Sequence, residues 1–277
     1  MIEVMFLFLL GLGFIVFASV QDIRTREVAN WISFSLIIFA LGFRFFYGLF
    51  NESFGFFYQG LIGLGIFLVL GNLLYYSRMF AGGDAKLMIA LGPVLAFSTS
   101  FIENLKIYAI FIFLFLLGGA IYGFIMTLLL SFRNFKNFKK GFVINLKNNK
   151  RMIYPVMILG ILLMIFGFIA GTFFALGVLV FLFPYFYLYA KTVDNVCMVK
   201  KINTKELTEG DWLFKEVKVG RELIKPKWEG LNKEQIKKIR KKYRVIKIKQ
   251  GIAFVPVFLV AFIVFFYFWA NGFFNLF

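Results

Sequence analysis

The stretch MFAGGDAKLMIALG, residues 79–92, lies between two apolar runs and carries an acidic residue, Asp84, directly after two glycines. It opens an apolar run over residues 87–101, which is shorter than the roughly 20 residues needed to cross the hydrocarbon core of a bilayer. If this run crosses a membrane, every later segment of the chain changes sides. The predicted fold therefore depends on how the short run is interpreted.

The composition of the chain indicates that most of it lies in lipid. Of its 277 residues, 61% are hydrophobic and 42 are Phe, and a soluble domain cannot bury that much apolar surface. Besides the short run, apolar runs of about the length of a membrane helix cover residues 4–20, 31–50, 54–76, 107–130, 152–168, 172–190 and 251–271. The first run has neither a basic n-region nor a small-residue cleavage site, so we expect a retained helix. The sequence predicts an all-α integral membrane protein.

The distribution of basic residues favours a span at residues 87–101. With eight spans, the loops on one face contain all but two of the 31 Lys and Arg residues, the exceptions being Arg44 and Lys106. Basic residues gather on the cytoplasmic side of membrane proteins, so we expect this face inside and both termini outside. Without the short span, the two most basic loops, residues 131–151 and 191–250, would lie outside.

This topology predicts a polytopic helical bundle of about eight spans with a small basic cytoplasmic segment. The expected parts are a membrane core with residues 1–130, a basic cytoplasmic loop with residues 131–151, two further spans with residues 152–190, a basic cytoplasmic segment with residues 191–250 and a last span with residues 251–277. Phe and Lys alternate loosely in the 131–151 loop, which suits a segment lying on anionic lipid headgroups. Nucleic acid, which the positive charge alone would allow, is not expected as a partner so close to the membrane.

The cytoplasmic segment of residues 191–250 is expected to be too short for much of a core. Asn232 is a plausible N-cap for a basic helix in which Ile236 and Ile239 share an apolar face. Valines alternate with charged residues over residues 217–219, which is typical of a short strand.

The chain lacks His and has one Cys, Cys197, which removes much of the usual repertoire of sites. Catalytic triads with His, His-rich metal sites, Cys–His pairs and Cys-cluster zinc sites are excluded. Glu209 and Asp211 lie close together and are either metal ligands or part of a solvated turn, and the turn is favoured. We expect no metal, no cofactor and no reactive thiol, so any chemistry must use carboxylates, Lys, Tyr or Ser.

The acids of the predicted inner face are the candidates for chemistry. Asp22 lies within one turn of the end of the first helix, Asp84 immediately precedes the fourth, and Glu27 balances two neighbouring Arg residues. Two carboxylates that approach closely cannot both ionise readily. The ionised member of such a pair activates a water molecule while the protonated member polarises a carbonyl group. The sequence therefore predicts that Asp22 and Asp84 form a hydrolytic pair.

Three residues beside Asp84 bear on this prediction. Gly82 and Gly83 permit backbone conformations with positive φ and let a substrate strand approach the main chain closely, although two glycines also simply break a chain between two spans. Lys86 either neutralises Asp84 or contacts lipid phosphate. The sequence does not indicate the substrate-binding residues.

Two motifs resemble the conserved segments of the type IV prepilin peptidases, which are membrane aspartyl proteases with a GxGD motif. QDIRTREVANWISF, residues 21–34, is similar to the first segment, and GGDAKLM, residues 82–88, to the second. The archaeal branch of the family, which processes preflagellins and archaeal prepilins, is the more similar one, because it lacks the zinc-binding cysteine domain of many bacterial members. The resemblance covers roughly residues 1–130.

This resemblance implies that Asp22 and Asp84 are the two catalytic aspartates. It implies a protease that removes the short basic leader of preflagellin or prepilin precursors at the cytoplasmic face of the cell membrane. Two departures concern the loops: Ala81 stands where the GxGD motif has its first glycine, and Ala29 stands where the family often has Pro. Neither departure removes a carboxylate, so they affect the expected loop geometry more than the chemistry.

Three other functions compete with this interpretation. A protease of the presenilin type would carry Tyr-Asp and Pro-Ala-Leu motifs, and the sequence contains neither. An ion-coupled transporter would place its carboxylates deeper within the spans, and the chain has no convincing internal repeat of the kind found in many transporters. A structural subunit anchored by its basic loops would survive the loss of both aspartates.

Overall fold

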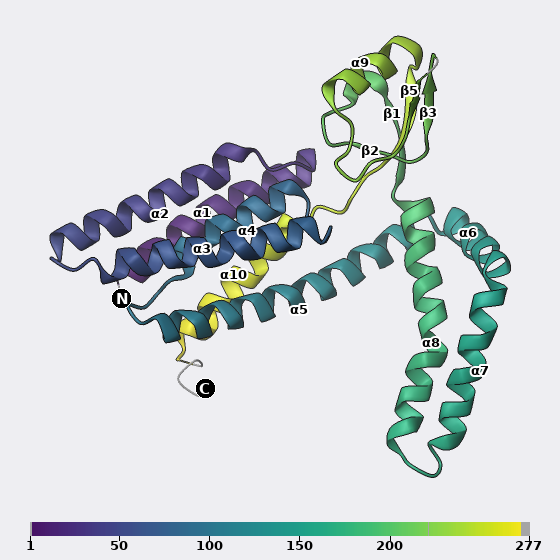
Figure 1. Cartoon of the computed structure of the whole chain (residues 1–277), viewed down its shortest axis with the longest axis horizontal. Helices are drawn as coiled ribbons and strands as arrows, with labels where there is room; N and C mark the ends of the chain where they lie inside the picture. Colours follow the sequence, from purple (N-terminus) through teal and green to yellow (C-terminus); the bar gives the residue numbers. More distant parts are fainter. Residues whose placement is uncertain (1, 221, 273–277) are drawn as a thin grey trace. The chain divides into compact units, whose positions relative to one another are not determined.

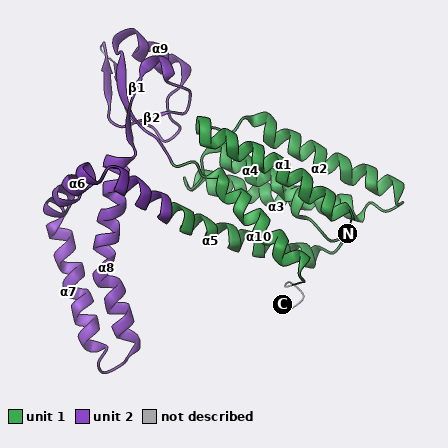
Figure 2. Ribbon diagram, turned by 180° about the vertical axis from the view of Figure 1, so that it is seen from behind, with its two compact units in different colours: residues 1–123, 252–277 green, residues 124–251 purple. Residues whose placement is uncertain are grey.

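The computed structural model of the chain describes residues 2–220 and 222–272, so the extreme ends of the expected first and last segments, and Arg221, lie outside the described residues. The chain is a polytopic helical membrane protein, as predicted (Figure 1). It divides into two compact units, which consist of residues 1–123 with 252–277 and of residues 124–251 (Figure 2). The second unit is thus inserted into the first.

The first unit is a helical bundle that combines the two ends of the chain. Its elements are α1 (Ile2–Thr25), α2 (Asn30–Phe50), α3 (Gly55–Tyr76), α4 (Gly82–Leu95), the first part of α5 (Phe101–Arg133) and α10 (Val255–Ala270). α4 packs against α1, α2 and α3, and α10 packs against α1.

The second unit begins within α5 and continues with three more helices and a π-helical turn. These are α6 (Phe135–Asn148), α7 (Lys150–Phe166), α8 (Thr172–Thr192) and the turn Val193–Cys197. Residues 131–151, expected as a loop, are mostly helical, and the chain bends by 80° between α6 and α7. α7 and α8 form a hairpin in which Gly160 leaves room for the backbone of Phe181.

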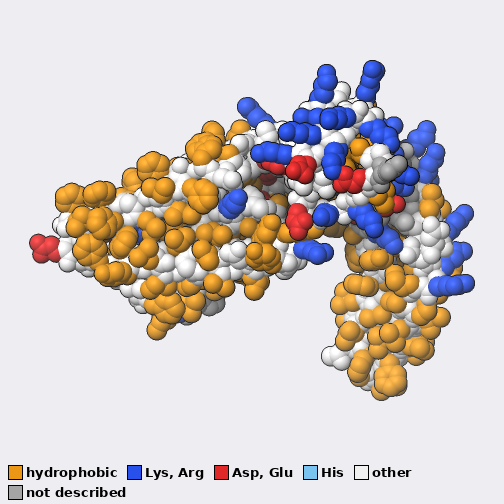
Figure 3. Space-filling view, turned by 45° about the horizontal axis from the view of Figure 1, so that its top comes forward, with side chains coloured by type: hydrophobic (Ala, Val, Ile, Leu, Met, Phe, Trp, Pro, Cys, Tyr) orange, Lys and Arg blue, Asp and Glu red, His pale blue; other side chains and the backbone are white. Residues whose placement is uncertain are grey.

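A small β domain completes the second unit. Its sheet has the order β1-β5-β2 and is antiparallel, with β1 (Val199–Asn203), β5 (Val245–Lys249) and β2 (Trp212–Leu213). A separate hairpin pairs β3 (Val217–Val219) with β4 (Glu222–Ile224), and α9 (Lys233–Lys242) packs against β3. Lys and Arg side chains gather on the outside of this region, whereas hydrophobic side chains cover the long helices (Figure 3).

The expectation that this segment is too short for much of a core is wrong. Nine Ile and Leu side chains are buried together between the strands and α9, because both layers direct one apolar face inward. The predicted helix is confirmed: Asn232 and Gln235 form a capping box at the start of α9, and Ile236 and Ile239 are buried. The predicted strand over residues 217–219 is also confirmed.

The acids Glu209 and Asp211 stabilise the backbone of this domain. Glu209 Oε1 accepts a hydrogen bond from the backbone N–H of Lys233 at 3.2 Å, and Asp211 Oδ2 accepts one from Thr208 at 2.8 Å. These contacts agree with the turn that the sequence favoured for the two acids.

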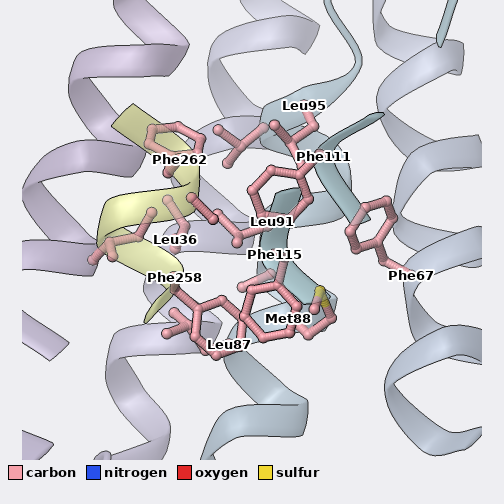
Figure 4. Close-up of a cluster of buried hydrophobic side chains, with 14 of the residues drawn as sticks. Leu36, Phe67, Leu87, Met88, Leu91, Leu95, Phe111, Phe115, Phe258 and Phe262 are labelled. Carbon is pink, nitrogen blue, oxygen red and sulfur yellow. The ribbon is translucent and has the colours of Figure 1, made fainter. Parts of the chain in front are cut away.

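α4 lies at the centre of the first unit. All residues from Leu87 to Phe97 except Ile89 are buried. Side chains from four other helices complete the cluster around it: Leu36 of α2, Phe67 of α3, Phe111 and Phe115 of α5, and Phe258 and Phe262 of α10 (Figure 4). Protein rather than lipid therefore surrounds most of α4.

Glycines allow α3 and α4 to cross closely. A Cβ atom at Gly63 would lie 2.5 Å from the carbonyl oxygen of Gly92 and equally close to the hydroxyl of Tyr108. Both distances are far inside van der Waals contact, so no larger residue fits there. Small residues let membrane helices pack this closely.

Helix length supports fewer spans than the predicted eight. Each expected run contains a helix, but α4 has only 14 residues and is about 21 Å long, whereas the hydrocarbon core is roughly 30 Å thick. Within the part of the chain that the structure describes, five helices are long and apolar enough to cross a membrane, or six if α6 and α7 count as one bent span, and α10 is a shorter apolar helix. The number of spans is thus approximate, and the assignment of inner and outer loops stays a prediction.

Arg44, which the charge count assigned to the outer face, is fully buried inside the first unit. Its Nε donates to the carbonyl oxygen of Pro93 at 2.7 Å, Nη1 to that of Phe56 at 2.7 Å and Nη2 to that of Ala96 at 2.5 Å. Pro93 and Ala96 lie at the C-terminal end of α4, where the last carbonyl groups have no partner within the helix. Arg44 caps this end, and its positive charge complements the negative end of the helix dipole.

We expect Arg44→Met to destabilise the protein by about 3 kcal/mol or more, because three buried carbonyl groups lose their donors. Thermal unfolding of the detergent-solubilised protein measures the change. The control is Arg133→Met, which removes an exposed Arg at the end of α5 and should shift the midpoint little. An Arg44→Met variant as stable as the wild type would show that α4 does not depend on this cap.

Candidate active site

Asp22 lies in the last turn of α1 and is buried, which confirms its predicted position near the helix end. Arg26, the first residue after the helix, has a left-handed φ of 61°, and its backbone N–H donates to the Asp22 carbonyl oxygen at 2.9 Å. A left-handed residue at this place is a common way to end a helix. The chain therefore turns directly beyond Asp22.

Polar side chains fix the turn that follows. Gln21 Oε1 accepts a hydrogen bond of 3.1 Å from the backbone N–H of Ala29, the N-cap of α2. Thr25 Oγ1 donates to the Gln21 carbonyl oxygen at 3.0 Å and to the Glu27 carbonyl oxygen at 3.1 Å. These bonds join the end of α1 to the start of α2, which gives the motif at residues 21–34 a structural basis.

Asp84 lies inside α4 rather than before it, so the predicted helix start was too late. The helix begins at Gly82, which makes Asp84 the third helical residue. Its carboxylate lies near the backbone amide of Ala81, the N-cap, which is the amide that faces an acid at this position in a capping box. Unlike Asp22, Asp84 is partly exposed.

The fold brings Asp22 and Asp84 together. The carboxylates are close enough for their charges to interact, and they belong to helices that pack against each other, α1 and α4. Asp22 also interacts with the charge of Arg26. The predicted approach of the two acids is therefore present, while their catalytic role stays a prediction.

The two glycines before Asp84 act differently from what the sequence suggested. Gly82 and Gly83 are helical, and neither has a positive φ. A Cβ atom at Gly83 would lie 3.3 Å from Cβ of Val28, which is tighter than ordinary van der Waals contact. Gly83 thus lets the turn after α1 approach the first turn of α4, and so brings the two aspartates near each other.

Lys86 connects the same two regions. Its Nζ donates a hydrogen bond of 2.7 Å to Asn30 Oδ1, and Asn30 is the first residue of α2. This contact is neither of the two roles expected for Lys86, an ion pair with Asp84 or a contact with lipid phosphate. Because Lys86 lies one turn into α4, this hydrogen bond links the motif at residues 82–88 to the motif at residues 21–34.

The described residues, 2–220 and 222–272, contain no cluster of three His, Cys, Asp or Glu side chains that would hold a metal ion. Cys197 is buried at the end of the π-helical turn. The chemistry that this geometry supports is that of a carboxylate pair.

Comparison with known proteins matches the part of the chain that contains both aspartates. Residues 9–134 match the type IV leader peptidase family. The resemblance of the two motifs to this family is thereby confirmed over this segment. The matched segment ends near the end of α5, so α6 to α10 lie outside it.

Two relatives carry the name preflagellin peptidase. The one from Methanococcus maripaludis is 25% identical over 137 residues, which are 47% of this chain and 59% of the relative. The one from Methanocaldococcus jannaschii is 25% identical over 88 residues, which are 32% of this chain and 37% of the relative. The chain thus spans less than two thirds of the length of either relative in these matches. No solved structure matches the chain significantly.

One contact of Asp22 comes from outside residues 9–134, the segment that matches the type IV leader peptidase family. The backbone N–H of Val255, the first residue of α10, donates to Asp22 Oδ2 at 3.0 Å. Sequence reasoning missed this bond, because the two residues are 233 positions apart. The neighbouring Pro256 marks the start of a helix but carries no information about its partner.

We expect a double-mutant cycle of Lys86→Met and Asn30→Ala to show a coupling of about 0.5–1 kcal/mol, because the two side chains share a hydrogen bond in the leader peptidase segment. Denaturant or thermal unfolding of the four proteins measures this coupling. Lys86→Met combined with Glu52→Gln is the control, because α2 separates Glu52 from Asn30, and its effects should add. Additive effects of Lys86→Met and Asn30→Ala would show that the hydrogen bond between these residues does not stabilise the protein.

Proposed function

We propose that the protein is a membrane aspartyl endopeptidase that removes the short basic leader of preflagellins or type IV prepilin-like precursors. The observation that carries this proposal is the approach of Asp22 and Asp84 from the ends of α1 and α4. The match of residues 9–134 to the type IV leader peptidase family and the names of the two relatives support the same substrate class.

A carboxylate pair performs this reaction with one proton between its members. The ionised carboxylate accepts a proton from a water molecule whose oxygen attacks the carbonyl carbon of the scissile peptide bond. The protonated carboxyl donates its proton to the carbonyl oxygen, which gives a neutral tetrahedral intermediate. Collapse of this intermediate transfers a proton to the leaving nitrogen and breaks the C–N bond. Neither a metal nor a thiol takes part in these steps.

The predicted eight-span topology supports cleavage at the cytoplasmic face. In that topology the loops that join α1 to α2 and α3 to α4 both fall on the side that contains nearly all Lys and Arg residues, which is the cytoplasmic side in membrane proteins. A basic leader remains on that side for the same reason. The scissile bond between leader and hydrophobic helix would then lie at the depth of the aspartates.

Asp22→Asn and Asp84→Asn should each reduce cleavage of a preflagellin or prepilin-like precursor by a factor of roughly 10² to 10⁴ or more, because each removes a proton-transfer group. Purified variants are incubated with the precursor in detergent, and the released leader is quantified by mass spectrometry. Glu52→Gln, which neutralises an acid at the other end of α2, is the matched control and should cleave normally. Near-normal turnover by either Asp→Asn variant would contradict the proposed catalytic role of the two aspartates.

The same assay tests the predicted independence from metal and thiol. Cleavage should persist in EDTA and after alkylation of Cys197, because neither treatment touches a carboxylate pair. Thermal unfolding of both Asp→Asn variants serves as the folding control. Loss of activity in EDTA that one added metal restores would contradict the proposed chemistry.

We further propose that α6 lies on the membrane surface and binds anionic lipid headgroups. Its side chains Lys136, Lys139 and Lys140 are exposed, and the 80° bend between α6 and α7 turns α6 toward the membrane plane if α7 crosses the bilayer. Phe138 packs against Tyr189 of α8 with ring centroids 5.6 Å apart. A helix with one basic and one apolar face is typical of interfacial segments.

Anionic lipid should therefore raise the thermal midpoint of the detergent-solubilised protein more than zwitterionic lipid does, because bound lipid stabilises the folded state. Replacing Lys136, Lys139 and Lys140 by Gln should reduce this rise. The same three residues replaced by Arg keep the charge and should preserve it. Equal midpoints with both lipids would argue against the lipid site.

A further inference from the structure

The N-terminus of α10 contacts the buried carboxylate of Asp22. Val255 donates its backbone N–H to Asp22 Oδ2 at 3.0 Å, and the backbone amide of Phe254 lies near the same carboxylate. Phe254 is the N-cap of α10 and Val255 its first helical residue. Both donors therefore belong to the group of N–H bonds that a helix leaves without a partner of its own.

Packing and one hydrogen bond hold this helix end in place. The ring of Phe254 lies 6.0 Å from that of Phe80 and 5.8 Å from that of Phe115, measured between centroids. Tyr122 of α5 donates its hydroxyl to the carbonyl oxygen of Ala253 at 2.8 Å. Val255 is fully buried. The donors of α10 are thus fixed before a substrate arrives.

The surroundings of the two aspartates differ in a way that separates their charges. The ionisable groups that interact with Asp22 are Arg26, Asp84 and Tyr122. Two amides from the positive end of α10 and the guanidinium of Arg26 all favour a negative charge on Asp22. Asp84 lies near the backbone amide of Ala81 at the start of its own helix. Because Asp22 has the larger set of positive partners, the negative charge of the pair is favoured at Asp22.

We propose that the N-terminus of α10 is part of the active site and holds Asp22 as the ionised member of the pair. This inference rests on the proposed peptidase function and assigns roles within it. Asp22 accepts the proton of the attacking water, and Asp84, the partly exposed member of the pair, donates its proton to the carbonyl oxygen. Val255 acts on the reaction through Asp22, so it is a positioning residue.

A pH–rate profile tests the assignment. The active pair holds one proton, so activity falls in acid when both carboxyls are protonated and in alkali when both are ionised. Val255→Pro removes the amide donor at the first helical position, where Pro itself is accepted, but Phe254 must then leave its helical backbone conformation. The singly ionised pair is then less stable relative to the doubly protonated pair. The acid limb, meaning the fall of activity on the acid side of the pH–rate profile, should therefore move to higher pH by about one unit or more. KM and the alkaline limb should change little.

Two further variants keep the test decisive. Val255→Ala retains the amide N–H, so its acid limb should stay at the wild-type pH. If Val255→Pro does not fold, Tyr122→Phe decides, because it loosens the segment that holds the donors and should move the acid limb in the same direction. Tyr267→Phe, three turns further along α10 and exposed, is its matched control.

The outcomes separate the inference from the function on which it rests. If the wild type cleaves the precursor but a folded Val255→Pro or Tyr122→Phe variant keeps the wild-type acid limb, the role of α10 is wrong and the peptidase stands. If the wild type cleaves neither preflagellin nor prepilin-like precursors, the proposed function itself is wrong.

Discussion

Helix ends buried inside a membrane protein must find hydrogen-bond partners within the protein, because no water reaches them. In the first unit this constraint acts at two places. Arg44 satisfies the C-terminal carbonyl groups of α4, and Asp22 accepts from the first residue of α10. At the partly exposed N-terminus of α4, Asp84 lies near the backbone amide of the N-cap, Ala81. These charged side chains stand at the ends of the short helix α4 and at the start of α10.

This arrangement gives the two aspartates a structural task beside the proposed catalytic one. Each carboxylate closes a helix N-terminus, so each is held at a defined place without a metal ion or a disulfide. A carboxylate oxygen can accept such a hydrogen bond whether the carboxyl is ionised or protonated. The scaffold therefore survives the proton movements that the proposed reaction requires. An amide in place of the carboxyl retains one acceptor oxygen, which is why loss of activity can be separated from loss of fold.

What the sequence predicted depended on local pattern. Apolar runs located the helices, and the position of Asp22 near a helix end follows from the turn-forming residues just beyond it. The contacts of Arg44 join residues 49 and 52 positions apart, and the Val255 bond joins residues 233 apart, so no local pattern reports them. Arg44 was counted only as a charge of the outer face for this reason. The sequence analysis attributed the glycines before Asp84 to backbone conformations with positive φ. In the structure, Gly83 is needed because Val28 lies too close for a larger side chain.

The place in the sequence at which the second unit is inserted is related to these contacts. It is inserted into the first unit after residue 123 and ends at residue 251, and the residues that flank it, Tyr122 and Ala253, share a hydrogen bond of 2.8 Å. A domain can be inserted where the two ends of the break lie close together, because the parent fold is then undisturbed. Here the second unit ends four residues before Val255, the donor to Asp22. The two places where the chain leaves and re-enters the first unit are thus joined close to the candidate active site.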